Sequence, residues 1–138
     1  MILLDTTVLI DIRRGKVEIK DILEKYNDTI CGISVITIYE LYVGLGHILQ
    51  KFGEISYKTN KEKTEKLLND FEIFDLNRLI LEKAGLKEGE LLAKGITIEF
   101  EDIIIGITAQ ILKAEKIITR NPEHFKYFEI PVQSYQFR

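Results

Sequence analysis

The sequence contains very little of what stabilises small secreted or fibrous proteins. Among its 138 residues there is one cysteine, Cys31, and there are only two prolines. A single cysteine forms no internal disulfide, so a disulfide-stapled secreted scaffold is excluded. The low proline and glycine content, beside 46% hydrophobic residues, excludes a disordered or collagen-like chain and indicates a globular domain.

Long apolar segments are also missing. The longest nearly uncharged window, residues 31–50, contains Glu40, and no apolar run reaches the roughly 18 residues that a membrane span requires. The first residues have no basic segment ahead of an apolar one, which is unlike a signal peptide. We therefore expect one soluble, cytoplasmic domain over residues 1–138, with no membrane attachment.

Positive charge is scarce too. The formal net charge is −3 and the sequence pI is about 5.5, whereas domains that bind phosphate backbones are usually basic. Taken alone, this balance argues against a nucleic-acid partner. The argument weakens if part of the acidity belongs to carboxylates that a bound metal ion neutralises, and RNA binding is then expected to be weak without metal.

Short apolar runs alternate with helical patterns along the chain. This alternation predicts an α/β fold with a central parallel sheet of four to five strands, flanked by helices on both faces. The expected strands are residues 2–4, 29–33, 71–75, 116–119 and 130–135. A first helix is expected after Asp5, from about residue 7, with its carboxyl end at residues 13–15. The other expected helices are residues 17–26, 34–49 with Ser34 as N-cap, 61–69, 78–94 ended by Gly95, 103–113 and 122–127, and residues 51–60 are expected to form a loop.

Three acidic residues stand in apolar surroundings. Asp5 directly follows the first expected strand, Glu40 is the only charged residue between Cys31 and Gln50, and Asp102 precedes a run of isoleucines. An isolated carboxylate is costly in such surroundings unless it is paired or binds a metal. Ligands of doubly wound sheets collect at the carboxyl ends of the strands. Convergence of these acids there predicts a site for a hard cation, Mg²⁺ or Mn²⁺.

Each acid also has a simpler interpretation. Asp5 and Asp102 each precede an expected helix, where aspartate is a common N-cap. Glu40 lies within a helix and has the alternative of a solvent-facing side chain. Thr6, Thr7 and the segment 119–121 follow expected strands, and ordinary loop chemistry accounts for them equally well.

Four segments, in order, resemble the successive motifs of PIN domains, and most closely those of the VapC-type toxins. They are ILLDTTV at residues 2–8, ISVITIYELYVG at 33–44, GITIEFEDIIIG at 95–106 and IITRNPEHF at 117–125. The resemblance extends over essentially the whole chain. It implies a PIN-like fold and a metal-dependent endoribonuclease, a hydrolase that cuts RNA phosphodiester bonds.

The resemblance also implies roles for individual residues. Asp5, Glu40 and Asp102 would be the family's first three acids, the ligands of Mg²⁺ or Mn²⁺, and Thr6 and Thr119 match positions that support the site. The fourth acidic position falls on Asn121, which we keep among the catalytic residues. Asparagine offers a carbonyl or amide to a metal-bound water but adds no charge, so a second metal becomes doubtful. No histidine is required, and His47 and His124 are expected to be positional or structural.

Partners follow from the resemblance as well. VapC-like proteins cut cellular RNA, are inhibited by a cognate antitoxin and form homodimers. Arg13, Arg14 and Arg120 are the candidates for RNA phosphate contacts, with a solvated surface role as the alternative for each. The apolar helix 34–49 is a candidate groove or dimer face through Tyr39, Tyr42 and Leu45, with plain core packing as its alternative.

Other functions remain open at this stage. A phosphotransfer enzyme would use an aspartate after the first strand, but the second aspartate of the dehalogenase type and the lysine of a response-regulator receiver are both missing. A PIN-like module that binds RNA or protein without cutting is compatible with Asn121. A housekeeping RNA-processing nuclease of the same fold would act without an antitoxin.

Overall fold

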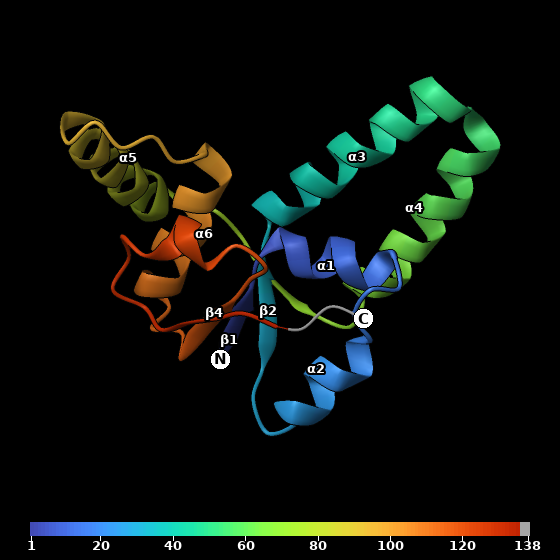
Figure 1. Cartoon of the computed structure of the whole chain (residues 1–138), viewed down its shortest axis with the longest axis horizontal. Coiled ribbons are helices and arrows are strands. Elements are labelled where there is room, and N and C mark those ends of the chain that lie inside the picture. Colours follow the sequence, from blue (N-terminus) through green and yellow to red (C-terminus); the bar gives the residue numbers. More distant parts are fainter. Residues whose placement is uncertain (136–138) are drawn as a thin grey trace.

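Strand β1 (Ile2–Leu4) lies at the centre of a five-stranded sheet (Figure 1). The structure is a computed structural model that describes residues 1–135, so the last three residues of the expected domain lie outside it, as does the side chain of Ile19. The other strands are β2 (Cys31–Ser34), β3 (Glu72–Phe74), β4 (Lys116–Ile118) and β5 (Val132–Gln133). The order is β3-β2-β1-β4-β5 and every neighbouring pair is parallel, which confirms the expected α/β fold.

Helices connect the strands and cover both faces of the sheet. Figure 1 shows α3 and α4 as a long arm that projects away from the sheet, with α5 and α6 on the other side. The bounds are α1 Thr6–Arg13, α2 Ile19–Lys25, α3 Ile36–Phe52, α4 Glu54–Leu68, α5 Arg78–Ala93 and α6 Phe100–Ile111, followed by the short 3₁₀ helix η1 at Pro122–Phe125.

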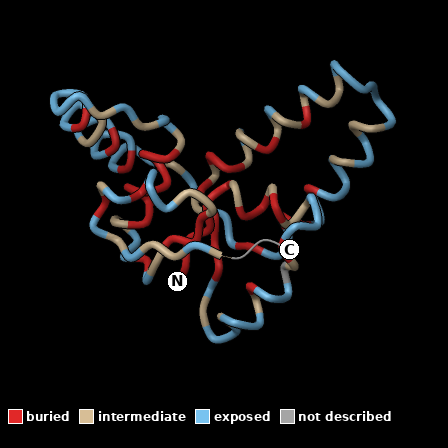
Figure 2. The backbone as a smooth tube through the Cα atoms, viewed as in Figure 1, coloured by how far each residue is buried: buried red, intermediate tan, exposed pale blue. Residues whose placement is uncertain are grey.

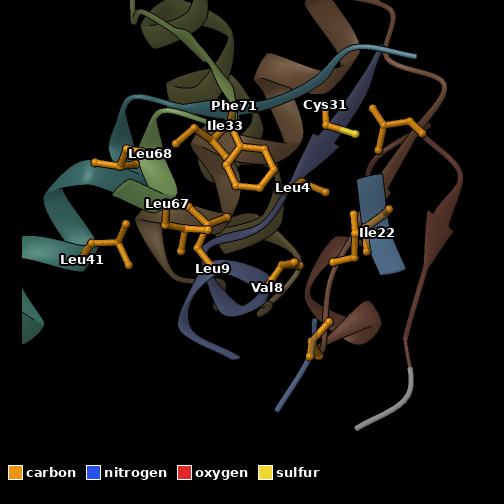
Figure 3. Packing of buried hydrophobic residues seen from close by; sticks show 13 residues of the cluster. Leu4, Val8, Leu9, Ile22, Cys31, Ile33, Leu41, Leu67, Leu68 and Phe71 are labelled. Atoms are coloured by element: carbon orange, nitrogen blue, oxygen red, sulfur yellow. The ribbon is translucent and has the colours of Figure 1, made fainter. Parts of the chain in front are cut away.

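The side chains of β1 alternate between two hydrophobic cores. Ile2 and Leu4 belong to one core, with residues of α1, α2 and α4, while Leu3 belongs to the other, with residues of α5 and α6. Figure 3 shows the ring of Phe71 within the first core, among its neighbours. Burial of one such side chain contributes roughly 1.5–3 kcal/mol, so β1 anchors both layers at once. In Figure 2 the buried segments accordingly converge on the sheet, while the outer ends of α3, α4 and α5 are exposed.

The parallel arrangement brings the carboxyl ends of β1, β2 and β4 to the same edge of the sheet. The backbone amide of Asp5, directly after β1, donates to the carbonyl of Ile118 at the end of β4, at 2.9 Å. α1 begins at once after Asp5, α3 begins two residues after β2, and Thr119 follows β4. Residues distant in sequence are therefore placed side by side at this edge.

The loop expected at residues 51–60 is wrong. Only Gly53 separates α3 from α4, with φ of 90°, a backbone conformation that favours glycine. α4 then runs as a largely exposed helix, and of its residues only Thr64, Leu67 and Leu68 are buried. Its polar composition suggested a loop, but a helix needs only this narrow contact with the core.

Two expected helix starts also need correction. Ser34 is not the N-cap of α3, because it is the buried last residue of β2; its Oγ still accepts a hydrogen bond from the amide of Ile36 at 3.2 Å. Asp102 is not an N-cap either, because α6 begins at Phe100 and the cap position is Glu99. Gly95 does follow the end of α5 as expected, and its φ of 73° closes the helix.

Among the described helices, none combines the length and apolar composition that crossing a bilayer requires.

Candidate functional site

The carboxylate of Asp5 accepts three hydrogen bonds from the residues around it. Its Oδ1 accepts from the backbone amide of Thr6 at 2.8 Å, so Asp5 does cap α1. Its Oδ2 accepts from the hydroxyls of Thr7 at 2.8 Å and Thr119 at 2.7 Å. With 3% of its surface exposed, Asp5 is held in one orientation from both β1–α1 and β4. The capping interpretation and the site interpretation are therefore compatible.

Glu40 lies on α3 and points toward the same edge of the sheet. Its Oε1 accepts from the hydroxyl of Thr6 at 2.6 Å, and that hydroxyl also contacts the hydroxyl of Thr37 at 2.9 Å. The pKa of Glu40 is raised to about 7, mainly by burial and in part by the negative charges of Asp5 and Asp102, and the hydrogen bond from Thr6 opposes the rise. The solvent-facing alternative for Glu40 is therefore wrong.

Asp102 occupies the first turn of α6 and is 9% exposed. Its Oδ2 lies 2.8 Å from Nδ1 of His124. The pKa of Asp102 is raised to about 6, mainly by burial and in part by the negative charge of Asp5, and His124 opposes the rise. Asp5 thus acts electrostatically on both Glu40 and Asp102, although the three residues come from distant parts of the chain.

These residues line one cavity of about 400 Å³. Its wall contains five acids, three of them Asp5, Glu40 and Asp102, and the side of α3 contributes Tyr39 and Val43, which are 59% and 56% exposed. The full lining is Asp5, Thr6, Thr7, Ile10, Tyr39, Glu40, Val43, Glu99, Glu101, Asp102, Asn121 and His124.

The cavity suits a divalent cation by its chemistry. The described residues contain no trio of acidic, histidine or cysteine side chains already close enough to hold an ion directly. However, three carboxylates share the cavity, and two of them have pKa values raised in part by the neighbouring negative charge. A cation relieves that repulsion, and oxygen donors that reach it partly through water are the ordinary environment of Mg²⁺.

Asn121 and Thr119 lie where the sequence pattern suggested. Asn121 lines the cavity, and its backbone amide donates to the hydroxyl of Thr119 at 3.0 Å. Thr119 is fully buried and links that amide to Asp5. The hydroxyl of Thr6 likewise donates a hydrogen bond to the carboxylate of Glu40.

The three arginines expected to contact RNA do not line this cavity. Arg120 pairs with the buried Asp11, with Nη1 2.9 Å from Oδ1, and Asp11 also accepts from the hydroxyl of Tyr135 at 2.5 Å. Arg13 donates to the hydroxyl of Thr64 on α4 at 3.1 Å, and burial lowers its pKa. Arg14 is exposed at the carboxyl end of α1, the end away from Asp5.

Sequence reasoning missed several residues of the cavity wall. For four of them, the only indication in the sequence was that they lie within a few positions of Asp102 or Glu40. These residues are Glu99, Glu101, Tyr39 and Val43. His124 was expected to be positional or structural, and it contacts Asp102. The local sequence did not indicate this contact, because it depends on the burial of the neighbouring Phe125, which packs η1 against α6.

On the expected face of α3, Leu45 is fully buried and belongs to the core. Tyr42 donates from its hydroxyl to Glu65 of α4, so it joins the two helices of the arm. Tyr39 remains largely exposed beside the cavity.

Comparison with protein families matches residues 2–129 to the PIN domain. Among solved structures, a chain of VapBC2 from Rickettsia felis, bound to a DNA fragment from its promoter, superposes with a TM-score of 0.83 at 24% identity, covering 99% of this chain and 100% of that one. A chain of VapBC-1 from nontypeable Haemophilus influenzae gives 0.77 at 26%, covering 97% and 98%. A chain of a toxin–antitoxin complex from Klebsiella pneumoniae gives 0.71 at 30%, covering 99% of both. Comparison with curated protein sequences gives no match.

Proposed function

This chain belongs to the PIN domain family, and from that premise we propose that it is an endoribonuclease dependent on Mg²⁺ or Mn²⁺, acting as the toxin of a VapBC-type pair. One observation carries the proposal. Asp5, Glu40 and Asp102, from three distant segments, line one cavity, and the negative charge of Asp5 contributes to the raised pKa of the other two. The same three residues match the acidic positions of the family's motifs.

The proposed roles follow from the contacts. Asp5, Glu40 and Asp102 would hold the cation; when bound, Mg²⁺ supplies charge neutralisation at the scissile phosphate and lowers the pKa of an attacking water. Thr119 and Thr6 orient the carboxylates of Asp5 and Glu40 through their hydroxyls. Asn121, at the cavity wall, would offer an uncharged amide at the position that the resemblance to the PIN motifs assigns to a fourth acid.

The proposed partners are RNA as substrate, a cognate antitoxin and a second copy of the chain. The similar solved structures include VapBC and toxin–antitoxin complexes, which supports the antitoxin. An acidic cavity is suited to a cation from any source, including an arginine of an inhibitor. Arg13, Arg14 and Arg120 do not line the cavity, so RNA contacts by these arginines are proposed for the surface outside it.

A PIN-fold module that binds without cutting is the second candidate, and the uncharged Asn121 is the observation that favours it. A processing nuclease without an antitoxin is a third. A cleavage assay separates the second candidate from the enzyme, and an adjacent antitoxin-like reading frame separates the third from the toxin.

The test is cleavage of a labelled RNA by the full chain, with Mg²⁺ or with EDTA. We expect cleavage only with metal, and a loss of at least about a hundredfold in Asp5→Asn and Asp102→Asn, because each removes a charged oxygen donor. Asp28→Asn, at an exposed position remote from the cavity, is the matched control and should cut normally. Metal-dependent activity retained by both cavity variants contradicts the proposal.

A further inference from the structure

His124 and Asp102 meet at the cavity wall from two different elements. Nδ1 of His124, on η1, lies 2.8 Å from Oδ2 of Asp102, in the first turn of α6. The Asp102 side chain is 13% exposed and the His124 side chain is 46% exposed. Their bond therefore lies at the boundary between the buried acids and the open cavity.

The backbone that carries His124 is held firmly. Its neighbour Phe125 is fully buried and packs near Phe128, with ring centroids 6.3 Å apart. Pro122 opens the short helix, and the amide of His124 donates to the carbonyl of Asn121 at 3.1 Å. The imidazole is thus held beside Asp102 by a short side chain on a well-packed turn.

The bond makes the two oxygens of Asp102 unequal. Oδ2 is engaged by His124, whereas no described residue donates a hydrogen bond to Oδ1. A carboxylate beside Asp5 and Glu101 experiences repulsion from both, and its terminal torsion is broad. A single fixed donor on one oxygen removes that freedom, as outer partners of metal-binding carboxylates do.

We propose that His124 is a positioning residue, which donates Nδ1–H to Oδ2 of Asp102 and so keeps Oδ1 turned to receive the cation. This inference rests on the proposed function, since it assigns a role toward the cation of that same site. His124 does not contact the cation in this assignment; it acts through Asp102.

The first test measures the affinity of the metal-free full chain for Mn²⁺ alone, by electron paramagnetic resonance titration. We expect His124→Ala to weaken Mn²⁺ binding by about 10- to 100-fold. His124→Asn, whose amide places a donor near the position of Nδ1, should recover most of that loss. His47→Ala is the matched control, because His47 is the only other histidine and is exposed on α3.

The outcomes separate this inference from the proposed function. If the unaltered chain neither binds Mn²⁺ nor cuts RNA, the proposed function fails and the inference with it. If the unaltered chain does both, while a folded His124→Ala binds Mn²⁺ equally well, only the inference fails. A loss in His124→Ala that His124→Asn does not recover also overturns it, because the donor is then not the cause.

The second test needs no metal. In ¹⁵N–¹H correlation spectra of the imidazoles, His124 is expected to carry a proton on Nδ1 that exchanges slowly, both before and after Mg²⁺ is added. A ring protonated only at Nε2 contradicts the assignment, because Nδ1 then has nothing to donate.

Discussion

The hydroxyl of Thr119 donates a 2.7 Å hydrogen bond to Oδ2 of Asp5, joining residues 114 positions apart in the chain. The contact exists because β1 and β4 are parallel neighbours, so the residues that follow them leave the sheet side by side. The orientation of Asp5, the most buried acid of the cavity, therefore depends on Thr119, which lies far from it in the sequence.

Replacing Thr119 by valine tests this dependence. The variant keeps the shape of the side chain but loses the donor to Asp5 and the acceptor for the Asn121 amide. We expect unfolding to become easier by about 1–2 kcal/mol and metal-dependent RNA cleavage to fall by about 10- to 100-fold. Chemical denaturation and initial cleavage rates measure the two effects.

Thr108→Val is the control for Thr119→Val. Thr108 is equally buried, but its hydroxyl donates to the carbonyl of Ile104 within α6, and it does not line the cavity. It should lose similar stability with normal cleavage. Equal cleavage by both variants would show that the Thr119 hydroxyl serves only the fold.

Gly106→Ala should destabilise the protein. A Cβ at Gly106, within α6, would lie 2.6 Å from ring atoms of the buried Phe128. Overpacking of this kind costs roughly 1–3 kcal/mol, which outweighs the gain of about 1 kcal/mol in helix propensity where the ring is unable to move. A lowered thermal midpoint in differential scanning calorimetry would confirm the clash.

The opposite sign is expected for Gly89→Ala, on α5. A Cβ there meets nothing within 4 Å, so only the helix propensity changes, and stability should rise by about 0.5–1 kcal/mol. If both alanine variants shift the midpoint in the same direction, the contact with Phe128 does not decide the outcome at Gly106.

Arg120→Ala is expected to act on stability. The guanidinium is the cationic partner of Asp11, whose side chain is fully buried. Its removal leaves a buried carboxylate that still accepts from Tyr135 but lacks this cation, at a cost of roughly 2–3 kcal/mol. The measurement is the free energy of unfolding in urea. Arg14→Ala, at an exposed position, should change it by less than about 0.5 kcal/mol.

The pH dependence of the metal-free protein should reveal Glu40. Its pKa is about 7 in the folded protein against an ordinary value of 4.5. Between these values the folded protein holds a proton that the unfolded chain has released, so the Glu40 contribution to stability falls as pH rises through this range. In EDTA, Glu40→Gln should therefore gain stability relative to the unaltered chain between pH 4.5 and 7.

The control for this pH series is Glu62→Gln, on the exposed surface of α4. Replacing this exposed side chain removes no buried contact, so the free energy of unfolding should change by less than about 0.5 kcal/mol. A difference between Glu40→Gln and the unaltered chain that does not vary between pH 4.5 and 7 would contradict a raised pKa of Glu40 in the folded protein.

The acids of the site were predictable because each interrupts an apolar pattern, which a single sequence displays directly. His124 was not, since residues 120–126 are polar and resemble any surface turn; only the packing of Phe125 brings the imidazole to Asp102. Arg120 was assigned to RNA for the same reason, because the local sequence does not show that Asp11 is fully buried behind it.

The sheet and most helices were predictable from hydrophobic periodicity, and the main failure, residues 51–60, is instructive. α4 is polar on nearly every side, so it presents no apolar stripe over its first half. Its helical state is set by the turn at Gly53 and by the few contacts near Thr64 and Leu67. These are tertiary contacts, which the local sequence pattern does not indicate.

The strand order has a consequence for synthesis. β1 is made first but occupies the centre, and its neighbour β4 is made more than a hundred residues later. During synthesis, Asp5, Glu40 and Asp102 are therefore present before β4 and the following Thr119, which orients the carboxylate of Asp5. Such long-range pairing forms late and slowly. The acidic cavity is consequently complete only after β4 has been synthesised and has paired with β1, so the three acids are held together last of all.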